Sequence, residues 1–511
     1  MPEHLLLRLK NNIKPQWKTA FFAAIIIGFL THLYIFTNTL PNHDSLFNIY
    51  GSQKKFALGR FFLSPFSGIS SYFDLPWVNG TLSIFYLALT AVALVELFDL
   101  RKNLSIVLTA GLLVTFPTVT STFSYMFTAD AYMLGSLTTV LALILTKKYK
   151  YGFLPGALLF YLSVGVYQAN LPFLLTLVTV FLIAEILGRK ADLKTVGVHI
   201  LRFFAVTAVG MALYGITFKL YTNFFAGKIS DYQGLSEVGD SSVTLAERFT
   251  LINDSFQKFF FRGFITDMPV NLFEVLNVVT FVLIILGFSW FAIYHKLYRH
   301  GALFGIAIGL LLSLPLSAYC LYFVSAEVSY HMLMVMALIS IYFLPIVFYD
   351  NYVHVKFTTP FLAWSTVLVS AVLIFNFAII ANIAYFNMNL KYERSYAFLN
   401  RVVDRIEETE GASEITTLAI FGRISMDPSV SSEEVPNSVP AMTGMLGSRF
   451  LAHPAHYKRM MKNYFGYSYD LATTEEKTAI EASNLYKEME PWPAASSVRR
   501  IDDTIIIKLD D

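Results

Sequence analysis

Cysteine and charge are the scarcest features of this chain. Cys320 is the single cysteine among 511 residues, which excludes an intrachain disulfide and a cysteine metal cluster. Charged residues make up 14% of the chain and the net charge is +2, so a basic nucleic-acid-binding protein is excluded. The sequence also has no Walker A, GxSxG or GxGxxG motif. The common phosphate-loop, serine-hydrolase and dinucleotide-binding sites are therefore not expected.

Apolar residues are abundant instead. They make up 55% of the chain, and the mean hydropathy is +0.55. A soluble domain of this length does not hide so much apolar surface, so we predict an all-α polytopic membrane protein. A membrane span needs about 20 mostly apolar residues, which gives about eleven spans. They run roughly over 19–38, 77–98, 103–121, 128–146, 152–168, 171–187, 198–223, 272–294, 302–323, 328–349 and 359–386.

Lysine and arginine gather in alternate connections, which sets the expected orientation. The connections near 119–127, 169–170 and 324–327 have none. The N-terminus is then cytoplasmic, and the long loops 39–76 and 224–271 lie outside. The basic connections hold Arg8, Lys10, Lys14 and Lys18, then Arg101 and Lys102, Lys147, Lys148 and Lys150, Arg189, Lys190 and Lys194, Lys296 and Arg299, and Lys356.

The chain divides into two expected domains. Residues 1–386 form the membrane domain, and residues 387–511 are polar enough for a soluble extracytoplasmic domain. Strands are expected near 415–421 and 503–509, which predicts a small α/β unit.

Asp44 is the first candidate catalytic residue. It follows the first span directly, at its expected outer end. A carboxylate there can be the N-cap of a helix starting at Ser45, or it can face a cavity as a general base. Asp44 has no DxD partner, so no metal or other cofactor is expected, although a divalent ion shared with Asp130 stays conceivable.

The loop behind Asp44 mixes aromatic and basic residues. Apolar positions between 46 and 58 predict a helix lying in the membrane interface, with Lys54 and Lys55 at headgroup depth. The two lysines can contact anionic lipid or substrate. Arg60, flanked by Gly59 and by aromatics, is the preferred phosphate ligand, because guanidinium pairs with phosphate in a bidentate way.

Further candidates stand at the outer ends of later spans. Asp130, Tyr167, Gln168 and Glu327 are candidate sugar or acceptor ligands; the alternatives are a solvated helix end for Asp130 and backbone satisfaction at a turn for Gln168. His331 and Arg262 are candidate ligands of the donor phosphate, and His331 can equally be a satisfied interfacial histidine. Arg262 belongs to a second expected interfacial helix, Phe256 to Phe264.

Several short motifs together resemble the Gtr-type glucosyltransferases of serotype conversion, which belong to the GT-C class of polytopic glycosyltransferases. The matching segments are Asn42-His43-Asp44, Gly59-Arg60, Thr128-Ala129-Asp130, Gly165-Val166-Tyr167-Gln168, Tyr392 to Tyr396 and Asp502 to Lys508. The chain departs from the pattern at Tyr330-His331, where an arginine tends to open the late span.

The resemblance implies a GT-C fold and transfer of a sugar from a polyprenyl phosphate to an acceptor outside the cytoplasmic membrane. It places the catalytic carboxylate at Asp44 and implies inversion. The acceptor can be O-antigen, teichoic acid or another envelope polysaccharide. His43-Asp44 replaces the adjacent acidic pair of eukaryotic protein mannosyltransferases, which favours a bacterial membrane. The alternatives are a transporter or flippase of lipid-linked saccharides, and a non-catalytic envelope assembly factor.

Overall fold

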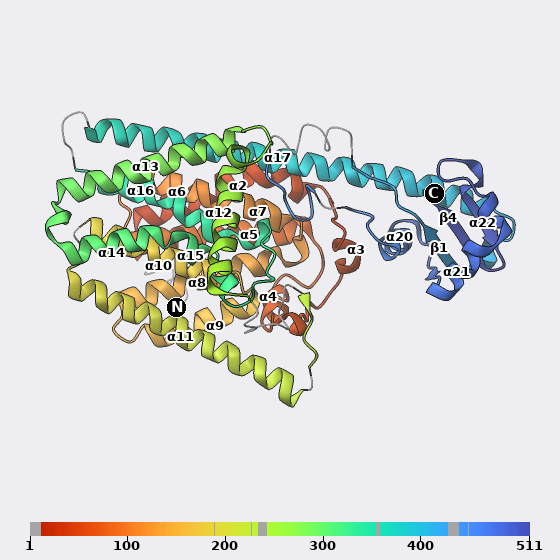
Figure 1. Cartoon of the computed structure of the whole chain (residues 1–511), viewed down its shortest axis with the longest axis horizontal. Coiled ribbons are helices and arrows are strands. Elements are labelled where there is room, and N and C mark those ends of the chain that lie inside the picture. Colours follow the sequence, from red (N-terminus) through yellow and green to blue (C-terminus); the bar gives the residue numbers. More distant parts are fainter. Residues whose placement is uncertain are drawn as a thin grey trace, which may run out of the picture.

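The structure is a computed structural model, and it describes residues 12–188, 190–225, 227–232, 243–353, 358–427, 439–447 and 449–510. A helical bundle forms one end of the molecule and a small sheet forms the other, with the long helix α17 joining them (Figure 1). The bundle helices are α2 (Pro15–Thr37), α5 (Pro76–Phe98), α6 (Asn103–Thr115), α7 (Pro117–Phe123), α8 (Met126–Lys148), α9 (Phe153–Val166), α10 (Asn170–Leu187), α11 (Leu193–Phe224), α12 (Leu245–Ile265), α13 (Leu272–Tyr294), α14 (Gly301–Leu312), α15 (Leu314–Ala318), α16 (Ile339–Asn351) and α17 (Thr358–Glu407).

The structure has several candidate membrane spans, but the expected count of eleven is not reached. Among the described residues, seven helices are long and apolar enough to cross a membrane, or eight if the bent pair α6 and α7 is one span. The expected spans 152–168, 302–323 and 328–349 contain the shorter apolar helices α9, α14 and α16. A 14-residue helix such as α9 rises only about 21 Å, which is less than the hydrocarbon core of a bilayer.

Large apolar side chains cover the outside of the bundle. On α11, Leu201 and Phe204 are more than 60% exposed, and Trp364 on α17 is 74% exposed. A helix that is apolar on all sides is stable only where lipid or protein surrounds it. These faces therefore fit contact with hydrocarbon, while α10 is packed in the bundle interior.

The C-terminal sheet contains both expected strands. The strands are β1 (Thr417–Phe421), β2 (Asp470–Leu471), β3 (Val498–Ile501) and β4 (Thr504–Lys508), in the order β2-β1-β4-β3. β1 pairs in parallel with β2 and β4, and β3 is antiparallel to β4. Ile505, Ile506 and Ile507 are all buried, because α17 covers one face and α21 (Thr474–Ala482) the other. α22 (Asn484–Glu488) follows α21, and α20 (Pro454–Met460) lies between the sheet and the bundle.

The expected interfacial helix over 46–58 is wrong. The segment between α2 and α5, called here the first long loop, has only α3 (Ser45–Asn48), the 3₁₀ turn η1 (Phe56–Leu58) and α4 (Leu63–Ser67). Gln53 and Gly59 have positive φ, which interrupts a helix on both sides of the lysines. The second expected helix lies within α12, which opens with a capping box between Thr244 and Glu247 and has a kink at Phe261. Its place in the membrane interface stays a prediction.

α17 continues without a break through residue 387, where the second domain was predicted to start. Four basic residues used for the orientation, Arg8, Lys10, Arg189 and Lys356, lie outside the described residues.

Candidate functional site

Asp44 does not act as a helix cap. Its side chain makes no capping hydrogen bond to α3; instead the backbone N–H of Ser45 donates to Asn42 Oδ1 at 2.8 Å. The Asp44 carboxylate is about half exposed and lies 3.6 Å from Nε2 of His43. The capping alternative is therefore wrong, and the carboxylate is left facing a cavity.

Arg60 is held in place by two motifs that are far apart in the sequence. Gln168 Nε2 donates to the Leu58 carbonyl at 2.7 Å, and the Tyr214 hydroxyl donates to the Gly59 carbonyl at 3.1 Å. Gly59 sits in the left-handed region with φ of +69°, and a Cβ there would lie 2.3 Å from the Tyr214 hydroxyl. Only glycine fits this turn without strain.

The Arg60 guanidinium rests in an aromatic cage. Nη1 donates to the Tyr132 hydroxyl at 2.9 Å, and the cation lies 4.8 Å from the centre of the Tyr167 ring. Tyr132 and Tyr167 are stacked on each other at 4.7 Å. Arg60 Nε is buried without a hydrogen-bond partner, and no carboxylate of the described residues pairs with the guanidinium. A buried donor that lacks a partner is costly, so this position is suited to an anion.

Asp44 and Arg60 line one cavity of about 290 Å³, called here the polar cavity. Lys55, Tyr132, Tyr167 and His331 line it as well. The remaining lining residues are Asn48, Gln53, Leu58, Leu63, Tyr125, Phe127, Thr128, Ser230, Tyr232, Leu333 and Thr443.

A second cavity of about 290 Å³ adjoins the polar cavity and is almost entirely apolar. We call it the apolar groove. Five residues line both spaces and so form their common border, namely Leu58, Arg60, Tyr167, Tyr232 and His331. The apolar groove continues between α9, α11 and the segment before α16, along Val164, Leu171, Met211, Phe218, Val324, Val328 and Met334.

Gln168 lines the apolar groove but not the polar cavity. Its side-chain amide nitrogen donates to the Leu58 carbonyl of the first long loop. Its place in the structure is a support for Arg60, whereas the sequence predicted a sugar or acceptor ligand.

His331 lies at this border. Burial lowers its pKa below the usual value; the hydrogen bond to the Ser329 carbonyl opposes this change, and Arg60 adds to it. Nδ1 lies 3.1 Å from that carbonyl and donates to it, so Nε2 is the ring nitrogen left for a ligand. A role for His331 at the donor phosphate stays a prediction.

Three predicted site residues line none of the three cavities described in this section. Asp130 is 0% exposed inside α8, where its carboxylate lies beside Ser70 and Asn79. Lys54 and Glu327 are exposed and line none of the cavities described here.

Arg262 lies in a third cavity, of about 410 Å³, where its Nε is 3.3 Å from the Glu274 carboxylate. We call this the Arg262 cavity. It is lined by Ser255, Lys258, Phe259, Asn271, Phe273, Glu274, Tyr319, Tyr330, His331, Met332, Val335, Pro440, Ala441, Thr443, Leu446 and Gly447.

Sequence reasoning missed two groups near Asp44. One is Asp74. Burial raises the pKa of Asp74 to about 7, although a hydrogen bond with Ser45 acts in the opposite direction. The other is His453-Pro454-Ala455-His456, an HxxH spacing that the prediction of no metal motif overlooked. The His456 ring lies 5.9 Å from His43, and burial lowers the pKa of His456 to about 4. Among the described ranges, no group of three or more His, Cys, Asp or Glu residues is placed to hold a metal ion.

Gly59→Ala should destabilise the protein by about 1–2 kcal/mol, because L-residues disfavour positive φ. Any activity that depends on Arg60 should also fall, because the turn that carries Arg60 is displaced from Tyr214. Thermal unfolding in detergent measures the loss of stability, and an activity assay measures the second effect. Adding Tyr214→Phe removes the hydroxyl clash but not the φ strain, so it should recover only part of the loss. Gly197→Ala, on α11 with open space around it, is the matched control; wild-type behaviour of Gly59→Ala would contradict the prediction.

Comparison with known proteins identifies the family. No curated protein was found to match the chain. Residues 33–376 match the family described as Glucosyl transferase GtrII, which covers most of the chain and contains Asp44, Arg60, Tyr167 and His331. Membership implies a membrane glycosyltransferase with a sugar donor and an acceptor. The chain belongs to the GtrII glucosyl transferase family.

Proposed function

We propose that the protein moves glucose or a related hexose from a polyprenyl phosphate to an envelope polysaccharide, with inversion of the anomeric carbon. The observation that carries this proposal is the border between the apolar groove and the polar cavity, where Arg60 faces both. A polyprenyl phosphate sugar has an apolar tail, a phosphate and a sugar in the same order as the apolar groove, Arg60 and the polar cavity. Its tail fits the apolar groove, its phosphate fits Arg60, and its sugar fits the polar cavity with Asp44.

Arg60 would act on the phosphate. Breaking the bond between the sugar and the phosphate leaves the electron pair on the phosphate oxygen, so negative charge grows there in the transition state. A preorganised cation at that point binds the transition state more tightly than the ground state. Lys55 lines the same cavity and can add to this effect.

Asp44 would act on the acceptor. As the acceptor oxygen bonds to the anomeric carbon, its proton passes to the Asp44 carboxylate. Asp44 is the only carboxylate among the described residues that line the polar cavity. A double displacement needs a second nucleophilic group on the sugar, so a single carboxylate favours a single displacement with inversion.

The charge distribution supports a site at the outer face of the membrane, which we propose to be the bacterial cytoplasmic membrane. Lys14 at the start of α2 pairs with Glu96 at 2.9 Å, and Lys147 at the end of α8 pairs with Asp99 at 2.7 Å. These basic connections therefore meet at one end of the bundle. Asp44 follows the other end of α2, and the positive end is the cytoplasmic one.

The test is transfer by the purified protein in nanodiscs. Polyprenyl phosphate glucose and its epimers are supplied with oligosaccharides released from the host envelope polysaccharide, and the product is read by NMR. We expect transfer from one donor and a product whose anomeric configuration is opposite to that of the donor. Retention would contradict the single displacement. Movement of intact donor across a vesicle membrane without transfer would instead indicate the transporter.

A further inference from the structure

The Arg262 cavity is separate from the donor route but touches the polar cavity. His331 and Thr443 line both spaces, whereas the apolar groove shares only His331 with the Arg262 cavity. The spaces therefore follow one another in the order apolar groove, polar cavity, Arg262 cavity. If the donor tail lies in the apolar groove and the donor sugar in the polar cavity, the Arg262 cavity reaches the sugar from the side away from the lipid.

The chemistry of the Arg262 cavity fits hydroxyl groups better than phosphate. Glu274 is 1% exposed; its Oε1 accepts from Arg262 Nε at 3.3 Å and its Oε2 from the Asn271 N–H at 3.1 Å. Arg262 Nη2 is buried and has no hydrogen-bond partner. A phosphate placed at this guanidinium would also meet the buried Glu274 carboxylate, and that repulsion is costly. A sugar hydroxyl can accept from Arg262 and donate to Glu274 at the same time.

Aromatic rings complete the wall. Tyr330 packs edge-on against Tyr319 at 4.7 Å, and both line the cavity with Phe259. Ligand sites commonly combine such apolar surfaces with a few placed polar groups. The Arg262–Glu274 pair among aromatic rings is therefore a surface that suits a saccharide.

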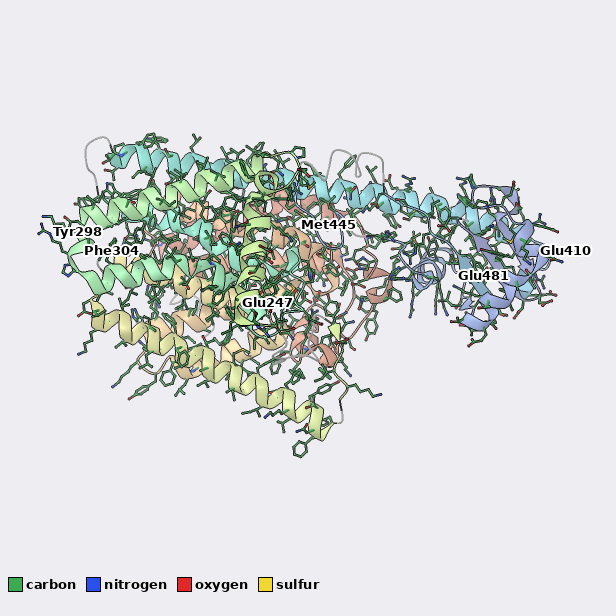
Figure 2. All side chains as sticks on the ribbon, viewed as in Figure 1. Glu247, Tyr298, Phe304, Glu410, Met445 and Glu481 are labelled. Atoms are coloured by element: carbon green, nitrogen blue, oxygen red, sulfur yellow. The ribbon has the colours of Figure 1, made fainter. Side chains whose placement is uncertain are left out.

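The C-terminal part of the chain supplies the opposite wall, the segment 439–447. The Thr443 carbonyl accepts from the hydroxyls of Ser121 at 3.2 Å and Ser124 at 3.0 Å. Met442 and Met445 are 0% exposed and belong to the bundle core. Figure 2 shows Met445 among the side chains of the bundle, far from Glu410 and Glu481 at the other end of the molecule. Pro440, Ala441 and Gly447 of this anchored segment face the cavity.

We propose that the Arg262 cavity is the acceptor subsite, which holds a saccharide of the envelope polysaccharide so that its hydroxyl reaches Asp44. This inference rests on the proposed function. It assigns Arg262 to the acceptor, whereas the sequence suggested the donor phosphate.

Ala441→Trp tests the subsite, because the Ala441 side chain is exposed and lines the cavity, so a larger side chain fills space without disturbing the core. Ala482→Trp, an exposed alanine at the end of α21, is the matched control. The probes are polyprenyl phosphate glucose and the released envelope oligosaccharide. Transfer kinetics give a KM for each. Release of glucose from the donor in the absence of oligosaccharide reports the donor site alone.

Ala441→Trp should raise the oligosaccharide KM by about tenfold or more, with the donor KM and donor hydrolysis unchanged. Lys258→Gln, at an exposed position on the same rim, should shift the same KM in the same direction by a smaller factor. An unchanged oligosaccharide KM in Ala441→Trp, or an equal rise in the donor KM, would overturn the acceptor subsite and leave the proposed function standing. A wild-type protein that neither transfers nor hydrolyses the sugar would overturn the proposed function itself.

Discussion

Asp44→Asn should lower the rate of glucosyl transfer by about 10²–10⁴ and leave donor binding close to that of the wild type. The side chain makes no capping bond to α3, so the amide replaces the carboxylate without removing a structural contact there. What is lost is the group that accepts the proton of the attacking hydroxyl. Single-turnover transfer and donor binding, measured on the same folded protein in nanodiscs, separate the two effects.

Glu327→Gln is the matched control for this variant. It removes a carboxylate that is exposed and lies outside the polar cavity, so transfer should stay close to wild type. Full activity of Asp44→Asn would move the base elsewhere. Loss of donor binding together with transfer would give Asp44 a binding role instead.

Arg60→Met should reduce turnover by about 10²–10³, the usual effect of removing one preorganised donor from a developing anion. Arg60→Lys should recover only part of this. The ammonium group lacks the planar fork that pairs with phosphate and that stacks on Tyr167. Turnover at saturating donor measures the loss, and thermal unfolding reports any change in the aromatic cage.

Lys54→Met is the control for loss of one positive charge from the first long loop. Lys54 is six residues before Arg60 in the same loop, but its side chain is exposed and outside the cavities. We expect nearly wild-type turnover from it. If Arg60→Met turned over like the wild type, the phosphate would have to be neutralised by another group, and Lys55 would be the next residue to change.

The sequence predicted those parts of the site that depend on position relative to a span. Asp44 is predicted from its place directly after an apolar run, and Arg60 from the glycine and aromatics beside it; the structure brings both into one cavity. Tyr167 was chosen as a helix-end residue, and it does line that cavity. The contacts of Gln168 could not be predicted from its position at a helix end. Its partners, Leu58 and Tyr214, are 110 and 46 residues away in the chain.

The helix predicted from the local apolar pattern in the first long loop was wrong. Apolar spacing from 46 to 58 fits a helix, but the turn at Gly59 is fixed by Tyr214 and Gln168, and this tertiary contact prevails. Asp130 and Arg262 lie outside the polar cavity, and for a related reason the sequence does not show this. A charged residue at a helix end needs a partner, but the sequence does not show where its side chain points. Arg262 pairs with the buried Glu274, and Asp130 is buried inside the bundle.

By itself, the sequence determined a membrane protein with an apolar helical bundle and a small C-terminal sheet. Apolar runs and the buried stretch Ile505-Ile506-Ile507 carry that information locally, because burial from water depends on the residues themselves. Only the tertiary structure decided that the segment 439–447 returns to the bundle and borders two cavities beside Asp44. Its hydrogen bonds join Thr443 to Ser121 and Ser124, more than 300 residues earlier, and no local pattern encodes which distant surfaces pack together.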